Sequence, residues 1–425
     1  MKERISMAAY KEDISEAKER MNAWWDHEIV DRPAISYLYP CEGASIAGLI
    51  DIFGFGWDLA KNPDNIEQVL NRFEERLPDL YFGGESIPSY FPNYGAGIMA
   101  AVFGVDPKFQ TRTVWFSRPT PVDEIVALLE GAKLNADNQW YSRLLRITEY
   151  AAKHSKGNYQ ISMTDLGGIL DILSSFLGPK NIILTMKRRP DIIDTCRAII
   201  LEKTLKVYDD LQNIIEKYND GCNSWLNVWC ARRWYPIQCD FSAMLNPKWF
   251  KRFALPDIQA QAAHMDYSIY HLDGPLAIPH LDDLLSIPEL TGIQWVPGDG
   301  REPMGHEKWY PLYKKIQVAG KNIVNTVTPS RLSAMYKHFD SKGLYLRTIY
   351  FGKHLADLYL PKFMGGDEGE LINNCIQWAK SRNLNRLNST TFTNFLVENE
   401  TKLGNRDVKK IYQEINRKLK KNSIS

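Results

Sequence analysis

Short β-rich stretches alternate with longer amphipathic stretches from residue 8 to about residue 350. The helical stretches include residues 8–28, 139–155 and 247–265. Such alternation is typical of an α/β protein with a parallel sheet. The predicted strands are residues 33–39, 113–118, 159–165, 224–230, 267–273, 292–296, 322–328 and 344–350.

Eight strands that are each followed by helical sequence predict an α/β fold of the (β/α)8 barrel type, the TIM barrel. A doubly wound open sheet is the alternative. That fold usually has a Gly-rich phosphate-binding turn after its first strand, and CEGASIAG (41–48) lacks the G-x-G-x-x-G spacing. The barrel is therefore the favoured fold.

The order of elements predicts three segments. Residues 1–30 form an N-terminal helical extension, and residues 31–360 form the barrel with an enlarged first βα connection at 41–111. Residues 361–425 form a polar linker and a basic C-terminal helix, which either docks RNA or a partner or packs one face on the barrel. The apolar positions of this helix follow helical spacing at Val408, Ile411, Ile415 and Leu419.

Charge and cysteine content narrow the function classes. Lys and Arg number 52 against 51 Asp and Glu, so no overall field favours nucleic acid or a membrane surface, and a small-molecule substrate is expected. Six cysteines without a C-x-x-C pair indicate a reducing compartment. Residues 1–20 lack a signal-peptide core, and we expect no membrane span, so the sequence predicts a cytoplasmic protein. The oligomeric state stays open.

His271 and Asp273 form the strongest candidate site. They lie two residues apart at the end of a predicted strand, so both side chains project from one face, and Gly274-Pro275 ends the strand. In a barrel the active site lies at this end of the strands. The pair could hold a metal, act in acid/base catalysis or clamp a substrate, and a structural His–Asp hydrogen bond is the alternative.

The predicted strand 224–230 places aromatic and amide groups in the barrel. Trp225, Asn227 and Trp229 share one face, and Arg232 lies on the loop above. Aromatic rings at a barrel mouth can stack on a planar ligand or hold a cation, and an Arg can bind a carboxylate. Core packing is the alternative for both tryptophans.

Other polar residues follow predicted strands or lie in the insertion. Asp165 ends the strand 159–165 before two glycines, where it either assists catalysis or caps the next helix. Trp295 and Glu302 lie at or after the strand 292–296. Asn93 lies in the Gly/Pro-rich part of the insertion, and we expect it to bind substrate because long insertions often contribute to a site.

Four segments resemble one known family. CDFSAMLNPKWFKRFALPDIQ (239–259) and YHLDGPLAIPHLDDLLSIPELTGIQWVPGDG (270–300) are similar to the uroporphyrinogen decarboxylase-like superfamily, as are FPNYGAGIMAAVFG (91–104) and MTDLGGILDILSSFLG (163–178). The resemblance extends over roughly residues 20–350. It implies a (β/α)8 barrel and either porphyrinogen decarboxylation or methyl transfer linked to a corrinoid or folate.

The chain departs from both enzyme types in that superfamily. The decarboxylases carry an N-terminal arginine motif, whereas the first strand here reads AISYLYPCEGAS. The zinc methyltransferases carry His-x-Cys and a later Cys, whereas this chain has His271-Leu-Asp273 and no Cys in LYLRTIYFG (344–352). The resemblance still implies zinc or another divalent metal on His271 and Asp273, with Glu302 or His306 as third ligand. Metal-free acid/base catalysis is the alternative.

The first functional hypothesis is a methyltransferase that moves a methyl group between a small methylated substrate and a corrinoid protein or folate. Its catalytic residues are His271, Asp273 and Asp165. A decarboxylase, of uroporphyrinogen decarboxylase type or for another carboxylated metabolite, is the second hypothesis, with Arg232 or Arg347 as anion clamp. A non-catalytic ligand-binding barrel is the third.

Overall fold

The fold is taken from a computed structural model of the 425-residue chain. It describes residues 7–44, 58–61, 63–110, 113–349, 353, 356, 368–382, 384, 386–398 and 408–421.

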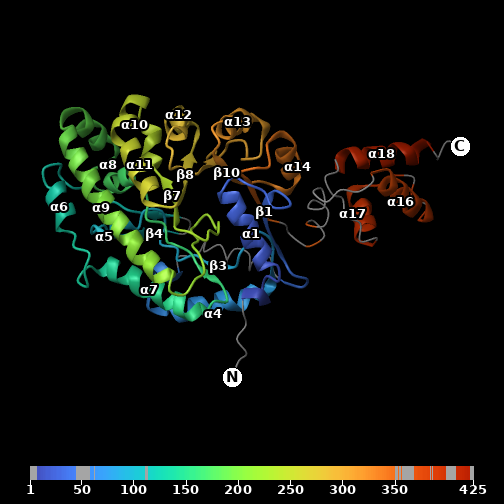
Figure 1. Cartoon of the computed structure of the whole chain (residues 1–425), viewed down its shortest axis with the longest axis horizontal. Coiled ribbons are helices and arrows are strands. Elements are labelled where there is room, and N and C mark those ends of the chain that lie inside the picture. Colours follow the sequence, from blue (N-terminus) through green and yellow to red (C-terminus); the bar gives the residue numbers. More distant parts are fainter. Residues whose placement is uncertain are drawn as a thin grey trace, which may run out of the picture.

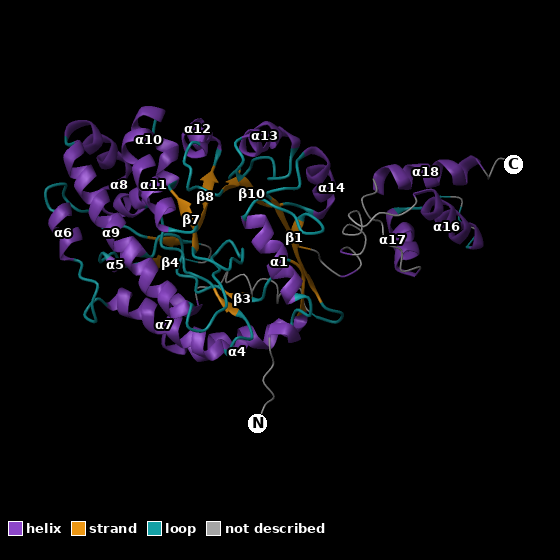
Figure 2. Cartoon of the chain, viewed as in Figure 1, coloured by secondary structure: helices purple, strands orange, loops and turns teal. Residues whose placement is uncertain are grey.

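A seven-stranded sheet forms the centre of an α/β fold (Figures 1 and 2). Its strand order is β2-β1-β11-β10-β9-β8-β7, and every neighbouring pair is parallel except β1 with β2. The first and last predicted strands, β1 and β11, are hydrogen-bonded neighbours in this sheet. The strands are β1 (Ala34–Pro40), β2 (Leu80–Gly84), β7 (Trp234–Gln238), β8 (Tyr267–Asp273), β9 (Gly292–Val296), β10 (Asn322–Thr326) and β11 (Leu344–Ile349).

A second parallel pair lies outside this sheet. It consists of β3 (Ser89–Tyr90) and β6 (Gln160–Ile161), and Met163 adds a single parallel bridge to Ser224. The predicted strand 159–165 is therefore present but short. The hydrogen bonds of the described residues give a seven-stranded sheet and two separate strand pairs, so a closed eight-stranded barrel stays a prediction.

Two predicted strands are wrong. In the segment 113–118 only β5 (Val114–Trp115) is a strand, and it pairs antiparallel with β4 (Lys108–Phe109) outside the central sheet. Residues 224–230 make only isolated bridges, and the strand of the central sheet is β7. The reason is local, because Asn227 adopts a φ of +49°. The Ser224 hydroxyl also accepts a hydrogen bond from the backbone of Leu226, which favours a turn.

Helices follow the outer side of the sheet in chain order (Figure 1). Outward side chains such as Ile237, Leu272 and Ile293 pack with these helices in the main apolar core. The helices are α7 (Gln139–Ser155), α8 (Ile169–Arg188), α9 (Pro190–Ile215), α10 (Pro247–Phe253), α11 (Leu255–His264), α12 (Leu281–Leu285), α13 (Tyr310–Val318) and α14 (Pro329–His338). Smaller helices are α3 (Asp58–Lys61), α4 (Ile66–Arg76), α5 (Met99–Val102) and α6 (Ile125–Gly131).

Helix α1 (Ile14–Trp25) packs against the inner face of the sheet. Its Trp24 and Trp25 belong to a separate apolar cluster with inward side chains of the strands, including Trp234, Ile269 and Tyr345. Trp234 and Tyr267 start their strands, and the Trp25 ring lies 5.1 Å from each of their rings. Helix α1 therefore fills the interior near the amino ends of the strands.

The C-terminal segment forms its own cluster of helices. The polar stretch predicted as a linker contains α16 (Glu368–Ser381) and α17 (Ser389–Glu398), and the predicted basic helix is α18 (Val408–Lys421). Ile411, Ile415 and Leu419 are buried together with residues of α16 and α17. The apolar face of α18 therefore packs within this cluster (Figure 1), and packing on the central core is not what the structure shows.

Helix α8 is long and apolar enough to cross a membrane by length and composition, although half of its apolar window is buried in the fold. The helix is interrupted at Gly178, whose φ is +71°, and it packs along α9. One packed helix of this kind is weak evidence for a span.

Candidate functional site

Three side chains with metal-ligating atoms meet at the carboxyl edge of the central sheet. They are Asp240, His271 and Asp273, and one ligating atom from each lies within 4.8 Å of the others. His271 and Asp273 end β8, and Asp240 opens a 3-10 helix (Asp240–Met244) directly after β7 and Cys239. Adjacent parallel strands thus bring three donors to one edge, where α/β enzymes place their active sites.

The sheet register fixes the histidine ring. His271 pairs with Gln238 of β7 on one side and with Gln294 of β9 on the other. The Nδ1 atom of His271 lies 2.5 Å from Oε1 of Gln294, a carbonyl oxygen that can only accept. Nδ1 therefore donates, and the neutral imidazole keeps its free lone pair on Nε2. A second hydrogen bond of this kind is the usual way in which proteins orient a metal-binding imidazole.

His271 is half-buried, whereas Asp240 is exposed. The Trp225 ring packs edge-on against the His271 ring at 5.1 Å between centroids. Burial by the surrounding protein raises the pKa of Asp240 although its side chain still reaches solvent; the charge of Asp273 adds to the shift and His271 opposes it. Two carboxyl groups this close hold their negative charges more easily when a cation lies between them.

Asp171 supports the position of Asp240. It lies in the first turn of α8 and accepts hydrogen bonds from the backbone N–H groups of Asp240 at 3.0 Å and Phe241 at 2.7 Å. Burial, and then the negative charge of Asp240, raise the pKa of Asp171 to about 7. A Cβ on Gly168 would come within 2.2 Å of the Asp171 carboxylate and 2.5 Å of the Gln238 carbonyl, so the close approach requires glycine.

Asp165 lies beside this group and carries a second perturbed carboxyl. It is buried and accepts hydrogen bonds from the Gly167 backbone at 2.9 Å and from Nε2 of Gln238 at 3.3 Å. Burial raises the pKa of Asp165 to about 7; the Gly167 hydrogen bond opposes the shift and the charge of Asp240 adds to it. A carboxyl with this pKa can exchange a proton near neutral pH.

Three residues predicted to line the site lie elsewhere. Trp295 faces the helices, where it is fully buried against Trp309 at 5.0 Å. The Trp229 backbone accepts a hydrogen bond from Trp25 of α1, and its ring packs in the inner cluster. Arg232 stacks over Tyr267, the first residue of β8, about 13 Å along the strand from His271 at 3.3 Å per residue.

The two remaining predicted residues form hydrogen bonds with residues outside the cluster of Asp240, His271 and Asp273. Asn227 accepts from the Ser89 hydroxyl at 2.7 Å and from Asn223 at 3.0 Å. Asn93 accepts from the backbone of Gly95, within the loop that abuts Gly167.

The expected third ligand is also different. Glu302 is exposed, and its carboxylate lies 3.6 Å from His306. Within the described part of the chain, neither of these residues belongs to the cluster with His271. The third side chain with a potential ligating atom is Asp240, which sequence reasoning missed. The signal is present in WYPIQCD (234–240), a β-rich stretch that ends in an acid and begins ten residues after the start of the predicted strand 224–230.

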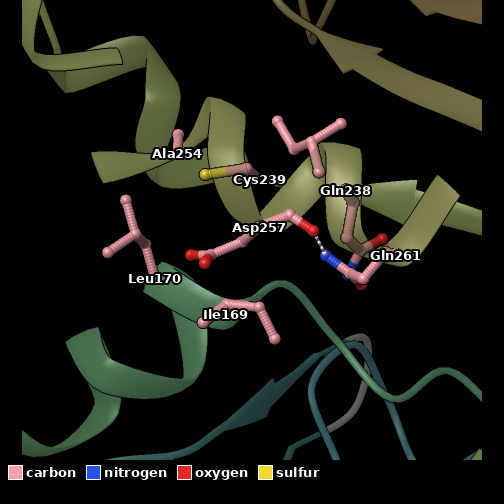
Figure 3. A pocket seen from close by; sticks show the side chains of 8 residues that line it. Ile169, Leu170, Gln238, Cys239, Ala254, Asp257 and Gln261 are labelled. Atoms are coloured by element: carbon pink, nitrogen blue, oxygen red, sulfur yellow. Dashed lines mark hydrogen bonds between the residues drawn. The ribbon is translucent and has the colours of Figure 1, made fainter. Parts of the chain in front are cut away.

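A small cavity lies behind the site, between β7 and the helices (Figure 3). Its volume of about 10 Å³ suits one water molecule, not a substrate. Gln238, Cys239 and Asp257 contribute to its lining, and Arg197 pairs with the Asp257 carboxylate at 2.7 and 2.8 Å. This cavity therefore lies next to the buried Arg197–Asp257 ion pair and is not a substrate pocket.

The donor set suits a divalent cation that accepts nitrogen and oxygen ligands. Two donors at about 2.1 Å in a tetrahedral zinc site are about 3.4 Å apart, so the side chains would need to close by at most about 1.4 Å to reach that separation. No thiolate is offered by the neighbouring Cys239, because burial raises the pKa of this thiol well above its usual range. The set fits zinc or a harder divalent ion better than a thiolate-rich zinc site.

Comparisons with known proteins find a similar fold among solved structures. No family model and no curated protein matches the chain. Among solved structures, the chain is similar to a methyltransferase from Methanosarcina mazei, with a TM-score of 0.52 and 15% sequence identity. The match covers 79% of this chain and 93% of that chain. At this identity the likeness establishes a shared α/β fold.

Proposed function

We propose that this chain is a methyltransferase whose active centre is a divalent metal site held by Asp240, His271 and Asp273. The observation that carries the proposal is the meeting of these three side chains at the carboxyl edge of the sheet. The fold likeness to a methyltransferase supports it. We further propose that the parallel strands close into a (β/α)8 barrel of the uroporphyrinogen decarboxylase-like type.

Each residue of the proposed site has a separate role in methyl transfer. The metal, zinc or another divalent ion, supplies Lewis acidity that lowers the pKa of an acceptor X–H group. His271 and the two carboxylates bind the ion, and Gln294 keeps the imidazole in the required tautomer. When the carrier donates, the bond from the methyl carbon to the carrier breaks, the X–CH3 bond forms and the X–H proton leaves. When the methylated substrate donates, the X–CH3 bond breaks, the methyl group bonds to the carrier and X takes up a proton. Asp165, with its pKa of about 7, is the group suited to take or supply that proton.

The methyl carrier follows from the resemblance seen in the sequence. We propose a corrinoid protein or a folate as carrier, and a small methylated molecule as its partner in the reaction. The oxygen-rich donor set favours acceptors or leaving groups that ligate through oxygen or nitrogen over thiolates.

Methyl transfer tests this function directly. The protein is stripped of metal, reloaded with zinc, manganese or cobalt, and assayed with methylcobalamin and methyltetrahydrofolate against panels of alcohols, amines and thiols. We expect metal-dependent transfer that His271→Ala abolishes and that Glu302→Gln, a matched exposed control, leaves unchanged. Turnover that is equal in His271→Ala would contradict the proposal.

A further inference from the structure

Arg347 projects into the same interior as the candidate site. It lies on β11, two residues beyond Tyr345, whose ring belongs to the inner cluster. Leu346 lies between them and packs in the outer core. Because side chains alternate along a strand, Arg347 faces inward. By the same rule His271 faces inward, because Ile269 two residues before it belongs to the inner cluster.

One loop touches both residues. The Arg347 guanidinium donates a hydrogen bond to the backbone carbonyl of Leu226. The preceding residue is Trp225, whose ring packs on His271 at 5.1 Å. Arg347 and His271 therefore face the same side of the sheet and both contact the loop at Trp225 and Leu226.

Among the residues that the structure describes, the Arg347 guanidinium has no ion-pair partner, whereas Arg197 has the bidentate partner Asp257. The side chain is deeply set, and desolvation lowers its pKa, yet part of its surface stays accessible. A guanidinium has five N–H donors arranged for bidentate binding, and a desolvated cation gains most from an anion that reaches it.

We propose that Arg347 binds a carboxylate of the substrate, so that the substrate is a small methylated carboxylic acid. This inference rests on the proposed function, because it assigns the other end of the molecule to the centre at Asp240, His271 and Asp273. The carboxylate fixes the orientation of the substrate, and the methylated atom faces the donors of β7 and β8. Arg347 then selects the substrate and takes no part in the bond changes.

Binding of a matched pair of probes tests the assignment. 3-Methoxypropionate and its neutral amide, 3-methoxypropanamide, differ in charge but not in size, and calorimetry on the zinc-loaded protein compares their affinities. We expect the acid to bind at least tenfold more tightly than the amide. Equal affinities in the wild-type protein would overturn the proposal without any substitution.

Substitutions locate the effect. We expect Arg347→Met to remove the preference for the acid and Arg347→Lys to keep part of it, while zinc affinity stays at the wild-type value. Arg232→Met, at the opposite end of the strands, is the matched control and should keep the preference. An Arg347→Met protein that is folded and still prefers the acid would overturn the proposal. Acid binding that depends on Arg347 in a protein without methyl transfer activity would instead contradict only the proposed function.

Discussion

Replacing Asp165 by Asn should make the stability of the protein less dependent on pH. Burial raises the pKa of Asp165 to about 7, whereas an aspartate in an unfolded chain titrates near 3.9. Between these values the folded protein holds a proton that the unfolded chain releases. The stability therefore falls as the pH rises from about 4 to about 7, and it stays at the lower value above that.

The magnitude follows from the shift. A difference of about three pKa units corresponds to about 4 kcal/mol, of which roughly 2–3 kcal/mol is lost between pH 5 and pH 8. Asparagine keeps an oxygen that can accept the hydrogen bond from Gly167 and carries no titratable proton. The variant should therefore lose that part of the pH dependence and be more stable relative to wild type at pH 8 than at pH 5.

Urea unfolding at pH 5, 6.5 and 8 measures this difference. The exposed Asp299→Asn is the control, and it should follow the wild-type curve. Asp171, whose pKa is also about 7, titrates in all three proteins, so the difference between Asp165→Asn and wild type reports on residue 165 together with its charge interaction with Asp171. A pH dependence that is identical in Asp165→Asn and wild type would show that Asp165 is already ionised at pH 5 and would refute the reasoning.

Three further substitutions test separate parts of the structure. Arg197→Met leaves the Asp257 carboxylate buried without its partner, and urea unfolding should show a loss of about 3–5 kcal/mol. Gly167→Ala places a Cβ 2.4 Å from the Gly97 Cα at a φ of +85°, so the melting temperature should fall by the equivalent of about 1–3 kcal/mol. Ile415→Ala should weaken the C-terminal helices by about 2–5 kcal/mol, measured as faster proteolysis within residues 368–421 with an unchanged melting temperature of the central sheet.

Strands with a β-rich composition and turn residues at both ends could be predicted from the sequence. Residues 267–273 and 292–296 are β-rich and bounded by turn residues, and the structure confirms both as strands. The pairing of His271 and Asp273 on one face followed directly from this assignment. Which face Trp295 takes depends on the register between β8 and β9, which pairs His271 with Gln294, and a single sequence does not contain that information.

The sequence does not predict Asp240 as a member of the cluster, because a local turn interrupts the strand-like residues 224–230. Residues 224–230 have strand-like composition, but Asn227 at positive φ turns the backbone there. A strand at 224–230 predicts Arg232 on the loop above the barrel, whereas Arg232 precedes β7 and lies at the amino end of the sheet. The ten-residue error in strand position also explains why Asp240 is not predicted, because only a strand at Trp234–Gln238 brings that acid to the carboxyl edge of the sheet.

Metal binding by the purified protein tests the central claim most directly. Calorimetric titration with zinc should give one site per chain, and Asp240→Asn, His271→Ala and Asp273→Asn should each lower the affinity by at least tenfold. Glu302→Gln, which changes the acid expected from the sequence, should bind zinc like wild type. An Asp240→Asn protein with wild-type affinity, or a Glu302→Gln protein with weakened affinity, would contradict a metal centre built from the ends of β7 and β8.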